Sequence, residues 1–217
     1  MEKVAAVKRL FLLLALFACV CGEVSAAVRP NLIFVLSDDL AQGDLGCYGQ
    51  QLIQTPHLDR LAREGTRYTQ AYCGTTVCAP SRTSLITGLH TGHSPIRANR
   101  EIGAEGQKPL PAGTLTVAQV LKSAGYATGH FGKWHLGSIQ KTSPVNPGAS
   151  GFDRWLSAYN FYDNDPILSR EGIATQFEGE SSQVAADAAI QFMREQSAKK
   201  QPFLAVVWFG SPHDPHK

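Results

Sequence analysis

Two stretches of the chain carry uninterrupted apolar residues of strand length. Residues 32–36 read LIFVL and follow Pro30, while residues 203–209 read FLAVVWF and follow Pro202. Both runs end in polar residues. Runs of this kind suit strands that are buried on both faces, as in a parallel sheet. We therefore expect two buried strands near the two ends of the sequence.

Three other segments carry helix signals, over residues 55–65, 114–126 and 182–197. Each begins near a Thr or Ser that can cap a helix, and the first two end at a Gly. A short strand and a glycine-punctuated loop follow the second helix, in YATGHFGKWHLG. Alternating strands and helices predict an α/β sheet with helices on both faces. Residues 138–179, rich in Gly, Pro, Asn, Ser and Asp, are expected to form a long irregular surface segment.

The first 26 residues have the pattern of a secretory signal. Lys3, Lys8 and Arg9 precede the apolar run LFLLLALFACV, and small residues follow in EVSAA. This order matches a basic region, an apolar region and a cleavage zone. The run is short for a membrane span, so a membrane anchor is the less favoured reading, and so is a lipid-modified Cys19. We expect an exported protein, periplasmic or extracellular, without a stable membrane span.

Composition adds little about partners. The 217 residues are 43% hydrophobic and 18% charged, with a net charge of +2. These values are ordinary for a globular protein and give no indication of nucleic-acid binding.

The mature sequence keeps an odd number of cysteines. Cys47, Cys73 and Cys78 lie beyond the predicted signal. In an oxidising compartment, an odd count leaves one thiol unpaired or chemically modified. A Cys47–Cys73 pair would leave Cys78 as the exception, and a pair of Cys47 with Cys78 is equally allowed by the count.

Polar residues follow each predicted strand. Asp38 and Asp39 follow the first, Lys133 and His135 the second, and His213 the third. Ligands in open α/β sheets bind beyond the carboxyl ends of the strands, so these residues are expected to converge. The adjacent carboxylates suit a hard cation such as calcium or magnesium, although paired Asp residues are also common in turns. The spacing of His90, His93 and His130 matches no strong zinc signature, and we interpret them as structural.

The stretch TTVCAPSRTSLITG places Cys78 before a predicted helix that starts near Pro80 and ends at Gly88. A helix N-terminus presents backbone N–H groups and the positive end of the helix dipole. Arg82, one turn into this helix, can reach the same place. The arrangement suits an anion and a nucleophile derived from cysteine.

CAPSRTSLITG resembles the signature of the type I sulfatases, in which the cysteine is oxidised to formylglycine. PNLIFVLSDDLAQGDLGCYG, TPHLDRLAREGTRYTQAY, GYATGHFGKWHLG and PFLAVVWFGSPHDPH resemble further segments of that family, in the same order. The resemblance covers residues 29–217. It implies an alkaline-phosphatase-like α/β sheet sandwiched by helices, and it makes residues 27–217 the N-terminal portion of a sulfatase catalytic domain.

The resemblance also implies residue roles. Asp38 and Asp39 would bind Ca²⁺ together with an oxygen of the formylglycine hydrate made from Cys78, whose other hydroxyl attacks sulfur. Arg82 would orient that group, and Lys133 would bridge it and the sulfate. His135 would take the proton from the remaining hydroxyl, and His213 would bind the ester oxygen and assist the leaving group. The implied partners are a sulfated small molecule or carbohydrate and a formylglycine-generating enzyme.

The chain departs from the family after His213. Family members continue with an Asp-Asn pair of metal ligands and another lysine, and Asp163 and Asn164 do not replace that pair. We therefore expect an incomplete core with the C-terminal part missing, and a chain that is weakly stable and largely inactive alone. The leading hypothesis is a sulfuric ester hydrolase. The alternatives are a formylglycine-dependent phosphonate or phosphodiester hydrolase of the same superfamily and a non-catalytic truncated paralogue.

Overall fold

The computed structural model describes residues 29–99, 108–160 and 163–213. The chain divides into two units between Pro30 and Asn31, and every element named below belongs to the second unit. The predicted signal over residues 1–26 lies outside the described residues.

The described part contains a six-stranded sheet with the strand order β1-β6-β2-β3-β4-β5. The strands are β1 (Leu32–Asp38), β2 (Ala127–Lys133), β3 (Arg154–Ala158), β4 (Ile167–Arg170), β5 (Ile173–Gln176) and β6 (Phe203–Pro212). The first four strands in that order run parallel, and β4 and β5 pair antiparallel. The α/β prediction is confirmed.

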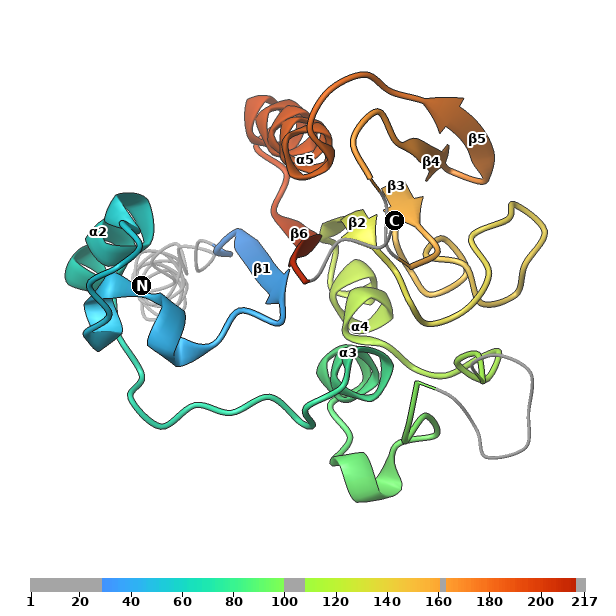
Figure 1. The fold of residues 1–217 in the computed structure, drawn as a ribbon. Helices are drawn as coiled ribbons and strands as arrows, with labels where there is room; N and C mark the ends of the chain where they lie inside the picture. Colours follow the sequence, from blue (N-terminus) through green and yellow to red (C-terminus); the bar gives the residue numbers. More distant parts are fainter. Residues whose placement is uncertain (1–28, 100–107, 161–162, 214–217) are drawn as a thin grey trace, which may run out of the picture. The chain divides into compact units, whose positions relative to one another are not determined.

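Helices cover both faces of this sheet. Figure 1 shows α5 (Ser181–Ala198) on one side of β6 and β2, with α4 (Val117–Ser123) and α3 (Cys78–Thr87) on the other. Side chains alternate between the two faces along β6, so Leu204, Val206 and Trp208 join the cluster under α3 and α4. Phe203, Ala205 and Val207 join the cluster under α5. The strand predicted at residues 203–209 is therefore buried on both faces, as expected.

The expectation of two-sided burial is wrong for the other apolar run. β1 forms as predicted and pairs with β6 in register from Leu32↔Leu204 to Leu36↔Trp208. It lies at one end of the strand order, however, and Ile33 and Val35 are more than half exposed. Leu36 packs partly against the cluster under α3 and α4, and the other apolar residues of the strand remain at the surface.

The predicted helices form close to their expected bounds. α2 (Pro56–Glu64) begins after Thr55, whose hydroxyl accepts from the Gly46 N–H and donates to Asp59 instead of capping the helix. α4 has a capping box, in which Thr116 accepts from the Gln119 N–H and the Gln119 side chain accepts from the Thr116 N–H. Short 3-10 turns occupy Gln42–Asp44, Gly46–Tyr48 and Thr91–His93.

The irregular segment predicted over residues 138–179 is wrong in part, because β3, β4 and β5 form there. Its first half is irregular, as expected. β3 is short, and its place is set by parallel pairing with β2, from Gly129↔Arg154 to Lys133↔Ala158. Long-range pairing of this kind leaves no local periodicity in a turn-rich sequence.

Candidate active site

The loop after β1, the end of β2 and the start of α3 meet at one place. Asp38 is the last residue of β1, and Lys133 is the last residue of β2. Because β1, β6 and β2 run parallel, their carboxyl ends lie at the same edge of the sheet. The convergence predicted from sequence is confirmed for these two residues, whose side chains form an ion pair.

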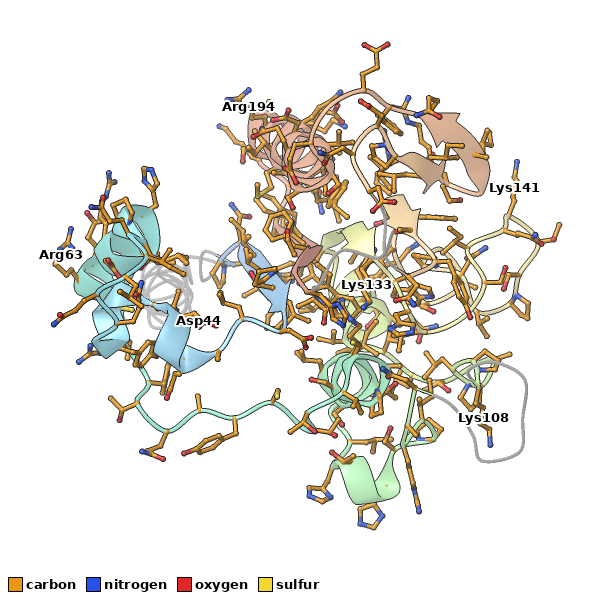
Figure 2. All side chains as sticks on the ribbon, in the orientation of Figure 1. Asp44, Arg63, Lys108, Lys133, Lys141 and Arg194 are labelled. Atoms are coloured by element: carbon orange, nitrogen blue, oxygen red, sulfur yellow. The ribbon has the colours of Figure 1, made fainter. Side chains whose placement is uncertain are left out.

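The centre of the site is a buried cluster of charges. The Lys133 ammonium donates to Asp38 Oδ2, and Arg82 Nη2 lies 3.4 Å from the same oxygen. The side chains of Lys133 and Arg82 are 0% and 1% exposed. Figure 2 shows Lys133 in the densely packed centre, whereas Lys141 and Arg194 project at the periphery. Two cations thus converge on one buried carboxylate.

Burial and charge oppose each other at Asp38. Burial alone raises the pKa of its carboxyl group, but the hydrogen bond from Lys133 and the charge of Arg82 outweigh burial, so the pKa is lowered. Burial lowers the pKa of Lys133, and Asp38 offsets part of that shift. Asp38 is therefore ionised at neutral pH.

Cys78 occupies the first turn of α3, two residues before the predicted start at Pro80. Its side chain lines the same cavity as Asp38 and contributes to the lowered pKa of the Asp38 carboxyl group. The helix terminus is less open than predicted, since the Asn99 amide oxygen accepts from the Ala79 N–H at 3.1 Å. The helix stops at Gly88, whose φ of 70° is the left-handed conformation that glycine adopts readily.

A cavity of about 430 Å³ opens at this cluster. Asp38, Asp39, Cys78 and Arg82 line it, together with Thr75 and other residues of the loop before α3. The volume falls within the range of small-molecule sites. The cavity thus combines two carboxylates, a thiol and a guanidinium.

Two histidines lie beside this cluster. His135 is 5% exposed, and burial with the charges of Lys133 and Arg82 lowers its pKa to about 3. It is therefore neutral at physiological pH and can accept a proton. His213 Nε2 lies 3.3 Å from Asp39 Oδ2. Asp39 and His135 both have positive φ, 62° and 54°, a region that residues other than glycine enter at a cost and often at functional sites.

Trp208 contacts the site, although no pattern in the sequence indicated that it would. The Arg82 guanidinium lies over its indole ring, 4.9 Å from the centroid. His130 stands edge-on to the same ring, its Nδ1 bonded to Ser157 Oγ at 2.8 Å. Burial lowers the pKa of His130 well below 6.5. A neutral, fully buried ring agrees with the interpretation of His130 as a structural residue.

The described cysteines carry no disulfide. Cys47, Cys73 and Cys78 are all free, so neither pairing that the cysteine count left open is present. Within residues 29–213, gaps excluded, no group of three or more His, Cys, Asp or Glu side chains is placed to hold a metal ion. No helix of the described part is long and apolar enough to cross a membrane.

The fold is that of an α/β protein of the alkaline-phosphatase-like class, with a cavity at the strand ends that Asp38, Asp39, Cys78 and Arg82 line. Residues 30–217 match the family described as Sulfatase. The chain belongs to the sulfatase family.

Curated relatives include the N-acetylgalactosamine-6-sulfatase of Sus scrofa, 31% identical, with alignment of 99% of this chain and 46% of the relative. Arylsulfatase A of Homo sapiens is 40% identical over 70% of this chain and 30% of the relative. The chain therefore spans less than half the length of these relatives.

The chain is also similar in structure to solved proteins. That of BT4656 in complex with its substrate D-glucosamine-2-N,6-O-disulfate has a TM-score of 0.74 at 31% identity, covering 85% of this chain and 35% of the other. That of Ps i-CgsB has a TM-score of 0.77 at 26% identity, covering 86% and 46%.

Proposed function

We propose that this chain carries the nucleophile and the anion-binding half of a sulfuric ester hydrolase that acts on an aryl or carbohydrate sulfate. The observation that carries the proposal is the meeting of Arg82 and Lys133 at the Asp38 carboxylate, beside a cavity that Asp38, Arg82 and Cys78 line together. A sulfate monoester is an anion whose transfer builds further negative charge on oxygen. Fixed cations in a buried site stabilise that charge more strongly than they would in water.

Residue 78 acts after its oxidation to formylglycine, whose hydrate supplies a nucleophilic oxygen that a cysteine lacks. A formylglycine-generating enzyme is the partner in that step. The position suits the modification, since Cys78 lines the cavity together with Asp38. Arg82 is fixed between Asp38 and Trp208, so it can orient the group at residue 78 without first losing side-chain freedom.

The proton steps are assigned to the two histidines. His135 is the base that accepts a proton from the hydrate, because its low pKa keeps the ring neutral. His213 stands beside Asp39 and assists the departure of the leaving group. Lys133 bridges residue 78 and the sulfate, since its ammonium already lies at the Asp38 carboxylate.

The described residues offer the type of ligand that calcium prefers, but too few of them to complete a site. Asp38 and Asp39 offer the carboxylate oxygens that Ca²⁺ prefers, and both line the cavity. Calcium takes six to eight oxygen ligands, and the described residues bring no third carboxylate to this place. We propose that Asp38, Asp39 and residue 78 form part of a calcium site whose other ligands lie outside the described residues.

Substrate and location are part of the same proposal. The relatives are named for sulfated amino sugars and aryl sulfates, which favours a sulfated carbohydrate or small molecule here. The signal-like pattern of residues 1–26 supports export to the periplasm or the extracellular space.

The test begins with the protein as its native host secretes it. Fragmentation of the tryptic peptide over residues 68–82 should find an aldehyde at position 78, and a Cys78→Ala variant should lose reactivity toward an aminooxy probe. Cleavage of an aryl sulfate should exceed that of an aryl phosphodiester. A preference for the diester would favour a phosphodiester hydrolase. An unmodified Cys78 in a competent host would mean a non-catalytic paralogue.

A further inference from the structure

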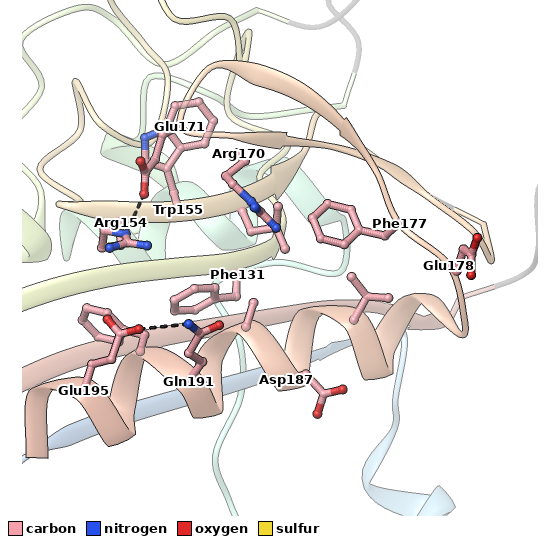
Figure 3. A pocket seen from close by; sticks show the side chains of 14 residues that line it. Phe131, Arg154, Trp155, Arg170, Glu171, Phe177, Glu178, Asp187, Gln191 and Glu195 are labelled. Atoms are coloured by element: carbon pink, nitrogen blue, oxygen red, sulfur yellow. Dashed lines mark hydrogen bonds and ion pairs between the residues drawn. The ribbon is translucent and has the colours of Figure 1, made fainter. Parts of the chain in front are cut away.

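A second cavity lies between α5 and strands β2 to β5, away from the candidate active site. It has a volume of about 390 Å³ and is lined from both sides, by α5 below and the β4–β5 hairpin above (Figure 3). Its floor belongs to the hydrophobic cluster under α5, whereas Trp208 belongs to the cluster on the other face of the sheet. No residue assigned to the proposed sulfatase site lines it.

The floor of this groove is aromatic and apolar. Phe131, Leu156 and Phe192 form it and are each 4% exposed. Phe131 and Phe192 have ring centroids 5.7 Å apart. Phe177 forms one wall, and Figure 3 shows its ring beside Arg170, above α5. The groove thus offers aromatic surface to a ligand that enters from solvent.

The rim of the groove is mainly acidic. Arg154 and Glu171 are paired with each other at 2.7 Å. The other rim carboxylates are Glu178, Asp187 and Glu195, and within the described part of the chain none of the three has a cation within 4.0 Å.

A single rim arginine faces these three carboxylates. The guanidinium of Arg170 lies over the Phe177 ring, 5.1 Å from the centroid. The groove therefore carries net negative charge, and it already holds one cation against an aromatic face.

We propose that this groove binds a small organic cation, an ammonium group carried on an apolar or aromatic body. Aromatic faces attract ammonium groups through the ring quadrupole, and the rim carboxylates add long-range attraction. The volume lies near the lower end of the range for small-molecule sites, which excludes a docked helix as the occupant. The body of the ligand lies against Phe177, above the nearly buried floor, with its ammonium toward Asp187 and Glu195.

Calorimetric titration of the full 217-residue chain with three probes tests this proposal. The probes are 2-phenylethylammonium, neutral 2-phenylethanol and anionic phenylacetate, which share a ring and differ in charge. The affinity should fall in that order, and added salt should weaken the binding of 2-phenylethylammonium alone. Equal affinity for all three, or preference for phenylacetate, would overturn the proposal, the latter because Arg170 would then dominate the rim.

Variants locate the binding. The double substitution Asp187→Asn and Glu195→Gln should weaken the binding of 2-phenylethylammonium about tenfold. Phe177→Leu should weaken it by a smaller factor. Glu64→Gln on α2, which removes one negative charge away from the groove, should leave the affinity unchanged. Circular dichroism checks that each variant folds. Cys78→Ala should bind as well as the parent chain, so the result is independent of the proposed sulfatase chemistry.

Sedimentation of the same samples tests whether a second copy of the chain fills the groove instead. The parent chain should sediment alike with and without the ammonium probe. A dimer that dissociates in the Asp187→Asn, Glu195→Gln variant would overturn the proposal, because a second copy of the chain would then fill the groove.

Discussion

Asp38 and Lys133 form a buried ion pair although 95 residues separate them in the sequence. The pair joins the ends of β1 and β2, which are not neighbours in the sheet because β6 lies between them. It also supplies the carboxylate oxygen that Arg82 Nη2 approaches to 3.4 Å. The ion pair therefore holds together the site and the two strand ends that carry it.

Lys133→Met should lower the free energy of unfolding by about 3–5 kcal/mol, because it leaves Asp38 buried with one of its cations removed. Urea denaturation measures this loss. Lys122→Met is the matched control, since it removes an ion pair with Asp153 whose side chains are 51% and 36% exposed, and should cost at most about 1 kcal/mol. Equal losses in the two variants would contradict the structural importance of the Asp38–Lys133 pair.

Arg82 and Trp208 should be energetically coupled. A double-mutant cycle with Arg82→Lys and Trp208→Leu isolates the contact between guanidinium and indole, with an expected coupling of about 0.5–2 kcal/mol. Lysine is not equivalent here, because its ammonium lacks the planar group that lies over the ring and donates to the Lys133 carbonyl. Additive losses of unfolding free energy would show that the two side chains act independently.

Much of the fold could be predicted because the signals were local. The apolar run of β6, the capping residue of α4 and the turn chemistry at Gly88 each act within a few residues. β3, β4 and β5 could not be predicted, since their place depends on pairing with distant strands. The prediction that β1 is buried on both faces was wrong for a related reason. An apolar run indicates a buried strand but does not show which elements would cover that strand.

The candidate site divides in the same way. Asp38, Lys133 and His213 were predictable because each follows a strand, and parallel strands share an edge. The contact of Trp208 with Arg82 and the hydrogen bond from Ala79 to Asn99 had no sequence signal, since they join different elements through side-chain packing. The structure thus adds the residues that hold the site in place.

Acid should destabilise the chain through its buried histidines. His135 has a pKa of about 3 in the folded state against 6.5 as a free side chain, so the unfolded chain binds more protons between these values. The stabilising effect of a neutral His135 is complete above pH 6.5 and is lost as the pH falls toward 3, by at most about 5 kcal/mol.

Urea midpoints from pH 7.5 to 4.5 measure this effect. His135→Gln should flatten the decline but not remove it, because His130 also has a lowered pKa and still contributes. His57→Gln, at an exposed position on α2, is the control and should leave the decline unchanged. An identical decline in His135→Gln and the parent chain would contradict the neutral, buried state of His135.

β1 should make the purified chain prone to self-association. Ile33 and Val35 are 54% and 57% exposed and lie on the same face of a strand that has no described partner beyond it. Exposed apolar edge strands pair with other chains, and charged side chains on the edge prevent this. Ile33→Lys with Val35→Lys should therefore raise the concentration at which light scattering first detects association, while the urea midpoint changes little. Leu52→Lys, which adds one of these charges at a 98% exposed residue outside any strand, tests the effect of added charge away from the strand edge. If Leu52→Lys suppressed association as well as the β1 variant, net charge and not the strand edge would govern self-association.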